Sequence, residues 1–198
     1  MPAEFLHSYV LDGKGGRNIL DSEGVAAWTP DAGLLWVHID VNDENARRWL
    51  ENESGLPETI IESLLAAETR PRSQINDVGS LVVLRGVNTN PGNNPEDMVS
   101  VRIWLEPTRI ISTRRRRLLS VQDVRAALDE GTGAATPGEF LVELIGCLAD
   151  RIGDFVNAIE DRISEAEDRV DAGGDTALRQ TTTGLRRQIA AVRRFLAP

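Results

Sequence analysis

The chain has 198 residues, of which 41% are hydrophobic and 27% charged, enough apolar material for one ordinary domain with an appendage. A formal net charge of −9 argues against non-specific nucleic-acid binding as the main activity, and the single cysteine, Cys147, excludes an internal disulfide and fits a reducing, cytosolic compartment. No window approaches the ~20 apolar residues of a membrane span and the start lacks a signal-peptide pattern, so the chain is expected to be soluble.

The first ~135 residues alternate between strand-like and helix-like patterns. The apolar run at 34–41 is rich in β-formers and predicts a buried strand. The segment 43–53 predicts a helix with Asp43 as its N-cap, and 57–68 predicts a second helix that begins at Pro57.

Further strands are expected at 73–79, 80–88, 98–106 and 108–114. The segment 89–97 is dense in turn formers, which predicts an antiparallel pair on either side of it. The strand at 108–114 is expected to pair with its predecessor across Glu106-Pro107. A helix should then run from an N-cap at Ser120 to a terminator at Gly131.

Beyond a Gly/Thr/Ala/Pro linker the pattern changes, and we divide the chain into 1–135 and 136–198. Apolar residues recur every three or four positions from Leu141 to Val170, which predicts one long helix. A break is expected at 172–175, followed by a second amphipathic helix marked by Leu178, Leu185, Ile189, Val192 and Leu196. These patterns together predict an α/β domain followed by long C-terminal helices.

Charge is unevenly distributed over the C-terminal third of the chain. Residues 139–175 contain eleven acids and three arginines, a balance of −8, whereas residues 176–198 contain five arginines and no acid, a balance of +5. An acidic helix is therefore followed by a basic one.

Residues that commonly perform catalysis are few. His38 lies inside a predicted strand and Cys147 inside the long helix, so a core histidine and a small buried helix residue are favoured over a ligand and a nucleophile. The glycines of "DGKGG" (12–16) lack the spacing of a phosphate-binding loop and predict a turn. The sequence thus gives no support for an enzyme or a bound cofactor.

The acidic face of the long helix is the candidate metal-attracting surface. Carboxylates four residues apart share a helix face, and hard divalent cations favour oxygen ligands. The candidate residues are Asp150, Asp154, Glu160, Asp161, Glu165 and Asp168. The alternative is a solvated face with Arg151, Arg162 and Arg169 as intrahelical partners. Because zinc prefers nitrogen and sulfur ligands, binding to these carboxylates should be weak.

Four consecutive arginines, Arg114, Arg115, Arg116 and Arg117, follow a predicted strand. No aromatic residues interleave with them, which argues against nucleic-acid binding. Salt bridges to acids of a neighbouring element or subunit, or a small-anion site, are the favoured interpretations.

Several blocks of the sequence resemble the ZntB zinc transporters of the CorA metal-ion transporter superfamily. They are "WVHID" (36–40), "ETRPR" (68–72), "LVVLRGVN" (81–88), "ISTRRRRLLSVQDVRAALDEGTG" (111–133), "LVELIGCLADRIGDFVNAIEDRISEAED" (141–168) and "LRRQIAAVRRFLAP" (185–198). The resemblance implies an α/β/α domain with a mixed sheet at the cytoplasmic face of the bacterial inner membrane, leading into a stalk helix of a funnel-shaped homopentamer. Two membrane helices and a Gly-Met-Asn motif are expected to follow.

The resemblance leaves the ion open between zinc and the Mg²⁺, Co²⁺ or Ni²⁺ of CorA-like channels. A different class of function, a free-standing α/β interaction module whose C-terminal hairpin binds a partner helix, also fits the residues. For the transporter, the expected partners are further copies of the chain and metal ions, with no nucleic acid.

Overall fold

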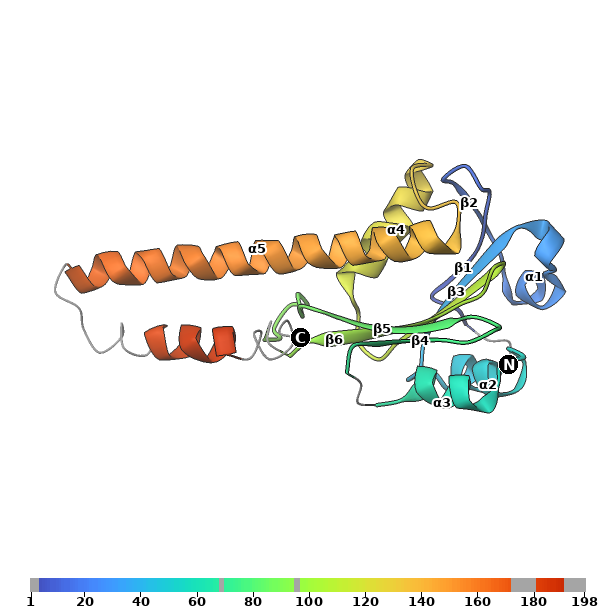
Figure 1. Cartoon of the computed structure of the whole chain (residues 1–198), viewed down its shortest axis with the longest axis horizontal. Helices are drawn as coiled ribbons and strands as arrows, with labels where there is room; N and C mark the ends of the chain where they lie inside the picture. Colours follow the sequence, from blue (N-terminus) through green and yellow to red (C-terminus); the bar gives the residue numbers. More distant parts are fainter. Residues whose placement is uncertain (1–3, 68–69, 95–96, 172–180, 191–198) are drawn as a thin grey trace.

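The computed structural model describes residues 4–67, 70–94, 97–171 and 181–190 (Figure 1). The expected break at 172–175 lies outside the described residues, as do Leu178, Val192 and Leu196. Residues 181–190 are helical, in agreement with the second amphipathic helix predicted around Leu185 and Ile189. Among the described residues, no helix is both long and apolar enough to cross a membrane.

A seven-stranded mixed sheet forms the centre of the fold, with strand order β2-β1-β3-β7-β6-β5-β4. Its strands are β1 (His7–Leu11), β2 (Arg17–Ile19), β3 (Leu34–Asp40), β4 (Arg72–Ile75), β5 (Ser80–Gly86), β6 (Val99–Leu105) and β7 (Arg109–Arg114). Only β3 and β7 are parallel neighbours among these strands, and the other pairs are antiparallel. The mixed sheet, the antiparallel pair β5–β6 and the pairing of β7 with β6 are confirmed.

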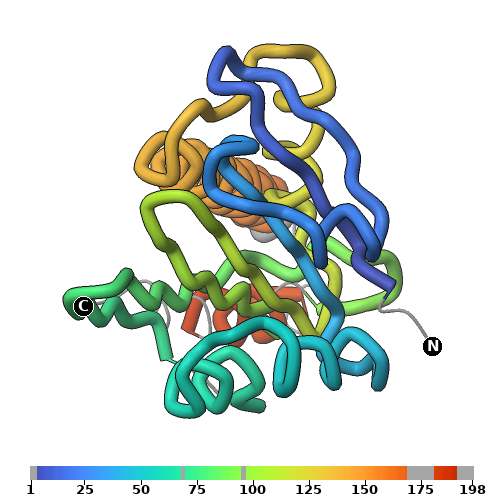
Figure 2. Tube along the Cα trace, turned by 90° about the vertical axis from the view of Figure 1, so that its right-hand side faces the viewer, coloured from blue at the N-terminus to red at the C-terminus, as the bar shows by residue number. Residues whose placement is uncertain are grey.

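Helices cover both faces of the sheet, as the α/β/α prediction requires (Figure 2). They are α1 (Ser22–Ala27), α2 (Glu44–Asn52), α3 (Glu58–Leu65), α4 (Leu119–Glu130) and α5 (Pro137–Asp171), with a short 3-10 helix at Pro30–Ala32. Alternate residues of β3 face opposite cores: Trp36 packs with α4 and α5, whereas Val37 packs with α2 and α3. The sheet is therefore buried on both faces.

Helix starts test the predicted caps. The Asp43 carboxylate accepts a hydrogen bond from the Ala46 N–H, so this N-cap is confirmed. The prediction for Ser120 is wrong, because α4 already begins at Leu119. Leu118 is 2% exposed in the core, and Ser120 faces α5, where its hydroxyl donates to the Cys147 carbonyl over 3.3 Å.

The long helix α5 is confirmed and comprises 35 residues. Its first turns belong to the core, because Phe140, Leu144 and Leu148 are each at most 5% exposed against the sheet and α4. Beyond them the helix projects away from the sheet (Figure 1). The division of the chain at residue 135 stays a prediction.

Candidate functional site

The projecting part of α5 carries all six candidate carboxylates, and every one of them is exposed. Asp150 and Asp154 share a helix face, and Glu160, Asp161, Glu165 and Asp168 follow towards the end of the helix. Within the described ranges, no three His, Cys, Asp or Glu side chains gather closely enough to hold a metal ion. The face is thus an extended negative surface, and a preformed coordination site is not found among these residues.

The arginines of α5 that the structure describes have partners on other helices. Arg151 forms a two-pronged ion pair with Asp123 of α4, at 2.8 Å from Nε and 2.7 Å from an Nη. Arg162 donates to the Gln188 side chain over 3.0 Å. The hydrogen-bonded partner of Arg151 therefore lies on α4 and links the two helices, whereas Asp154 of its own helix acts on Arg151 only through its charge.

The arginine run divides at the end of β7. Arg114 approaches Asp40 of β3 at 3.4 Å, as expected for pairing with an acid of a neighbouring element. Arg115 points to the opposite face of the sheet and donates to the Leu65 carbonyl over 2.6 Å. Arg116 and Arg117 are exposed. The four residues therefore have three different surroundings.

Side chains from the sheet cap the carboxyl end of α3. Thr113 donates to the Leu64 carbonyl over 2.8 Å, and Arg115 donates to the next carbonyl along the chain. Arg102 donates to the carbonyls of Ala66 at 2.6 Å and Ala67 at 3.3 Å. These donors satisfy carbonyls that lack helical partners and place positive charge at the negative end of the helix dipole.

A polar cluster lies on the opposite face, beneath α4. Ser112 Oγ is 2.8 Å from His38 Nδ1 and accepts from the Trp36 indole over 2.9 Å. His7 lies opposite His38 in the β1–β3 register, and the ring centroids are 5.6 Å apart. His38 is fully buried, which confirms its core position, although its Nε2 has no hydrogen-bond partner among the described residues.

The electrostatics of this cluster favour neutral imidazoles. Burial, together with the charges of Arg125, Arg114 and Arg17, lowers the pKa of His7 to about 4. Burial also lowers the pKa of His38 well below its usual range. Two neutral, aromatic-packed histidines agree with a structural role in the core.

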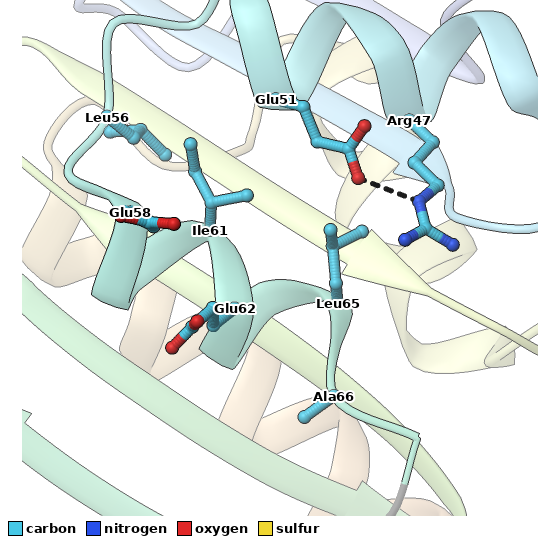
Figure 3. A pocket seen from close by; sticks show the side chains of 8 residues that line it. All are labelled: Arg47, Glu51, Leu56, Glu58, Ile61, Glu62, Leu65 and Ala66. Carbon is cyan, nitrogen blue, oxygen red and sulfur yellow. Dashed lines mark hydrogen bonds and ion pairs between the residues drawn. The ribbon is translucent and has the colours of Figure 1, made fainter.

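A surface groove of about 590 Å³ lies between α2 and α3 (Figure 3). Leu56, Ile61 and Leu65 give it an apolar wall, and the Arg47–Glu51 ion pair of 2.8 Å closes one side. Glu58 and Glu62 stand on the α3 side. The groove is open and mixed in character, and it holds none of the candidate residues predicted from the sequence.

Some residues of interest were missed at the sequence level. The sequence predicts strands that contain Arg102 and Ser112 and indicates no further role for either residue. The available signal for Arg102 was a charge inside an apolar run, "VSVRIWL", in which the flanking side chains alternate between the two cores.

The structure defines a class of protein: an α/β/α domain with a mixed sheet, extended by a long, outwardly acidic helix. Residues 31–198 match the family described as CorA-like Mg²⁺ transporter protein. The chain belongs to this family.

Individual relatives make the comparison more specific. The divalent cation transporter CmaX of Pseudomonas aeruginosa is 40% identical over 152 residues, which cover 74% of this chain and 45% of that protein. The zinc transport protein ZntB of Yersinia enterocolitica is 33% identical over 148 residues, 75% of this chain and 44% of that protein. The chain thus spans less than half the length of these relatives, and the ZntB-like resemblance is confirmed.

Solved structures agree in fold. Full-length CmaX superposes with a TM-score of 0.88 at 36% identity, covering 98% of this chain and 60% of that one. The cytoplasmic domain of ZntB from Vibrio parahaemolyticus gives a TM-score of 0.81 at 24% identity, covering 96% and 74%. The latter similarity shows the fold alone.

Proposed function

We propose that this chain forms the cytoplasmic part of a divalent-cation transporter of the bacterial inner membrane, with zinc as the first candidate ion. The observation that carries the proposal is the sequence similarity to CmaX and ZntB, which are named as cation and zinc transporters. Transport itself would require the segments that these relatives have beyond the matched region.

The contribution of this chain would be electrostatic. The exposed carboxylates of α5 create a negative potential that concentrates divalent cations near the helix. Because the charges are solvated, salt screens the effect over about 8–10 Å at physiological ionic strength. The acidic face would therefore supply cations to a pathway without binding them tightly, and regulation by metal would act through the same residues.

Calorimetry of the chain with Zn²⁺ and Mg²⁺ at moderate salt tests this role. We expect weak binding that falls when Asp150→Asn and Asp154→Asn are combined. The matched control is Glu58→Gln with Glu62→Gln, another exposed pair four residues apart, on α3. Equal losses of metal affinity in the two double variants would contradict a diffuse acidic surface on α5. A dissociation constant on the order of nanomolar, about 12 kcal/mol of binding free energy, would contradict it as well.

Magnesium is the second candidate ion, since the matched family is described by Mg²⁺ transport. Competition separates the two in the complete protein: a zinc transporter keeps its zinc flux in excess Mg²⁺, whereas a magnesium channel loses it.

Assembly into a homo-oligomer, with five copies expected, is part of the same proposal. Exposed apolar side chains on α5 support it, notably Val142 at 71% and Ile145 at 45% exposure. Sedimentation of the complete protein in detergent should give a pentamer, and a monomer would contradict the proposal. No nucleic acid is expected among its partners.

A further inference from the structure

Arg102 is the most deeply buried charged residue of the described chain, with 1% of its surface exposed. It lies in β6 on the sheet face that α3 covers, two residues before the buried Trp104 on that same face. Burying an ionised side chain is costly unless hydrogen bonds and an opposite charge compensate for it. The surroundings of Arg102 therefore have to supply that compensation.

The capping of α3 uses only part of the hydrogen-bonding capacity of this guanidinium. One Nη donates to Ala66 and Ala67, whereas Nε and the other Nη have no hydrogen-bond partner among the described residues. Arg115 is in the same condition: its Nη2 caps Leu65, and its buried Nε has no partner within those ranges. Two neighbouring guanidiniums thus have buried N–H groups that lack a hydrogen-bond partner among the described residues.

The sheet register gathers further positive charge around Arg102. Arg72 of β4 and Arg102 of β6 lie on either side of Val83 in one cross-strand row. Arg85 lies two residues beyond Val83 and thus on the same face. Burial first, and then the charges of Arg115, Arg85 and Arg72, lower the pKa of Arg102 to about 10. Every charged group among the described residues that acts on this pKa is thus another arginine.

The arginines of the cluster differ in exposure. Arg102 is buried, Arg85 and Arg115 are half-buried, and Arg72 is exposed on the edge strand β4. A buried Arg102 beside Arg115, with Arg72 exposed on the same sheet face, gives this face a positive potential that attracts anions. Arginine is suited to this task because its planar N–H groups match the oxygen atoms of phosphate or carboxylate.

We propose that Arg102, Arg115 and Arg72 form a binding site for a phosphate group on the α3 face of the sheet. The buried N–H groups of Arg102 and Arg115 hold its oxygen atoms, and Arg72 supplies exposed charge on the same sheet face. The phosphate comes either from free inorganic phosphate or from a nucleotide. The site lies on the opposite face of the sheet from α5 and its carboxylates.

The competing explanation is an acid of the chain itself. Glu68 follows Ala67 directly in the sequence and lies outside the described residues. A carboxylate of the chain that reached the same guanidiniums would neutralise them and leave no site for a ligand.

The test is calorimetric titration of the purified chain, in a phosphate-free buffer, with sodium phosphate and, separately, with ATP. Sodium chloride of equal ionic strength is the reference. Arg115→Gln should weaken binding about tenfold or more, because it removes a charge-assisted hydrogen bond. Arg72→Gln removes only the exposed charge and should weaken binding by about threefold. Arg116→Gln, an exposed neighbour in the same run, is the matched control and should change binding less than twofold.

Thermal unfolding without ligand shows whether each variant still folds. If Arg115→Gln does not fold, the binding measured for Arg72→Gln still decides the test. Tighter binding of phosphate than of ATP identifies the free ion, and the reverse identifies a nucleotide. The proposal is overturned if neither ligand binds the wild-type chain above the chloride reference, or if Arg116→Gln weakens binding as much as Arg115→Gln. Phosphate binding that arises only in Glu68→Gln would also overturn it and assign the counter-charge to Glu68.

Discussion

Replacement of Phe140 by alanine tests whether the first turns of α5 belong to the core of the α/β domain. Phe140 is 2% exposed, and its ring packs edge-to-face on Trp36 with centroids 4.8 Å apart. The substitution removes buried apolar area and leaves a cavity, which together should cost about 3–5 kcal/mol of stability. The lost aromatic pair accounts for about 0.5–1.5 kcal/mol of this cost. This is a large fraction of the total stability of a domain.

Urea unfolding followed by tryptophan fluorescence and circular dichroism measures this cost. Val142→Ala is the matched control on the same helix, measured on the chain diluted to a monomer, because Val142 is 71% exposed within one copy and its truncation there should cost no more than about 0.5 kcal/mol. A cost below about 1 kcal/mol for Phe140→Ala, with an unchanged dependence on urea, would refute the packing of α5 on the sheet.

Three further predictions concern stability. The folded pKa values of His7 and His38 lie below the unfolded value of about 6.5, so the unfolded chain binds more protons at acidic pH. The free energy of unfolding should therefore fall as the pH drops from about 7 towards 4, by up to about 1.4 kcal/mol per pH unit for each histidine. A His7→Gln variant whose stability depends on pH as steeply as the wild type would contradict this. Gly79→Ala should destabilise the fold by about 1–3 kcal/mol, because the added Cβ would lie 2.5 Å from the Leu105 carbonyl oxygen. Gly146 has open space around it on α5, so Gly146→Ala should stabilise the fold by about 0.5–1 kcal/mol, measured by thermal unfolding. A double-mutant cycle on Arg151 and Asp123 should give a coupling of about 0.5–1 kcal/mol that shrinks with salt, and zero coupling at low salt would show that the pair does not join α4 to α5.

The sequence predicted much of the fold because its signals were local. A continuous apolar run rich in β-formers marked β3, and periodic apolar residues marked α5. Turn formers marked the β5–β6 hairpin, and Asp43 marked the start of α2. The strands β1 and β2 and the helix α1 were not predicted. In β1 every residue from His7 to Leu11 is buried, including polar ones, so neither alternation nor a clear apolar run marks the strand. The misplaced start of α4 has a similar cause, since Leu118 and Ser120 are positioned by contacts with α5 and the core.

Prediction of the candidate sites was limited by the same division between local and tertiary information. The acidic positions of α5 could be identified because a helix places them by its period alone. The arginine run could be identified as a motif. Arg114 and Arg115 nevertheless have different partners, because consecutive residues at the end of a strand point to opposite faces of the sheet. The association of Arg102 with Arg72 depends on strand register across β4, β5 and β6, which the sequence does not reveal.

Ion flux through the complete protein tests the central claim most directly. The product of the whole reading frame that contains this chain, purified in detergent and placed in liposomes, should move Zn²⁺ across the membrane in the presence of excess Mg²⁺. Combined Asp150→Asn and Asp154→Asn should slow that flux at low salt and have a smaller effect at high salt. The account predicts zinc flux with this salt-dependent loss. Liposomes that carry the folded protein but pass neither Zn²⁺ nor Mg²⁺ would contradict it.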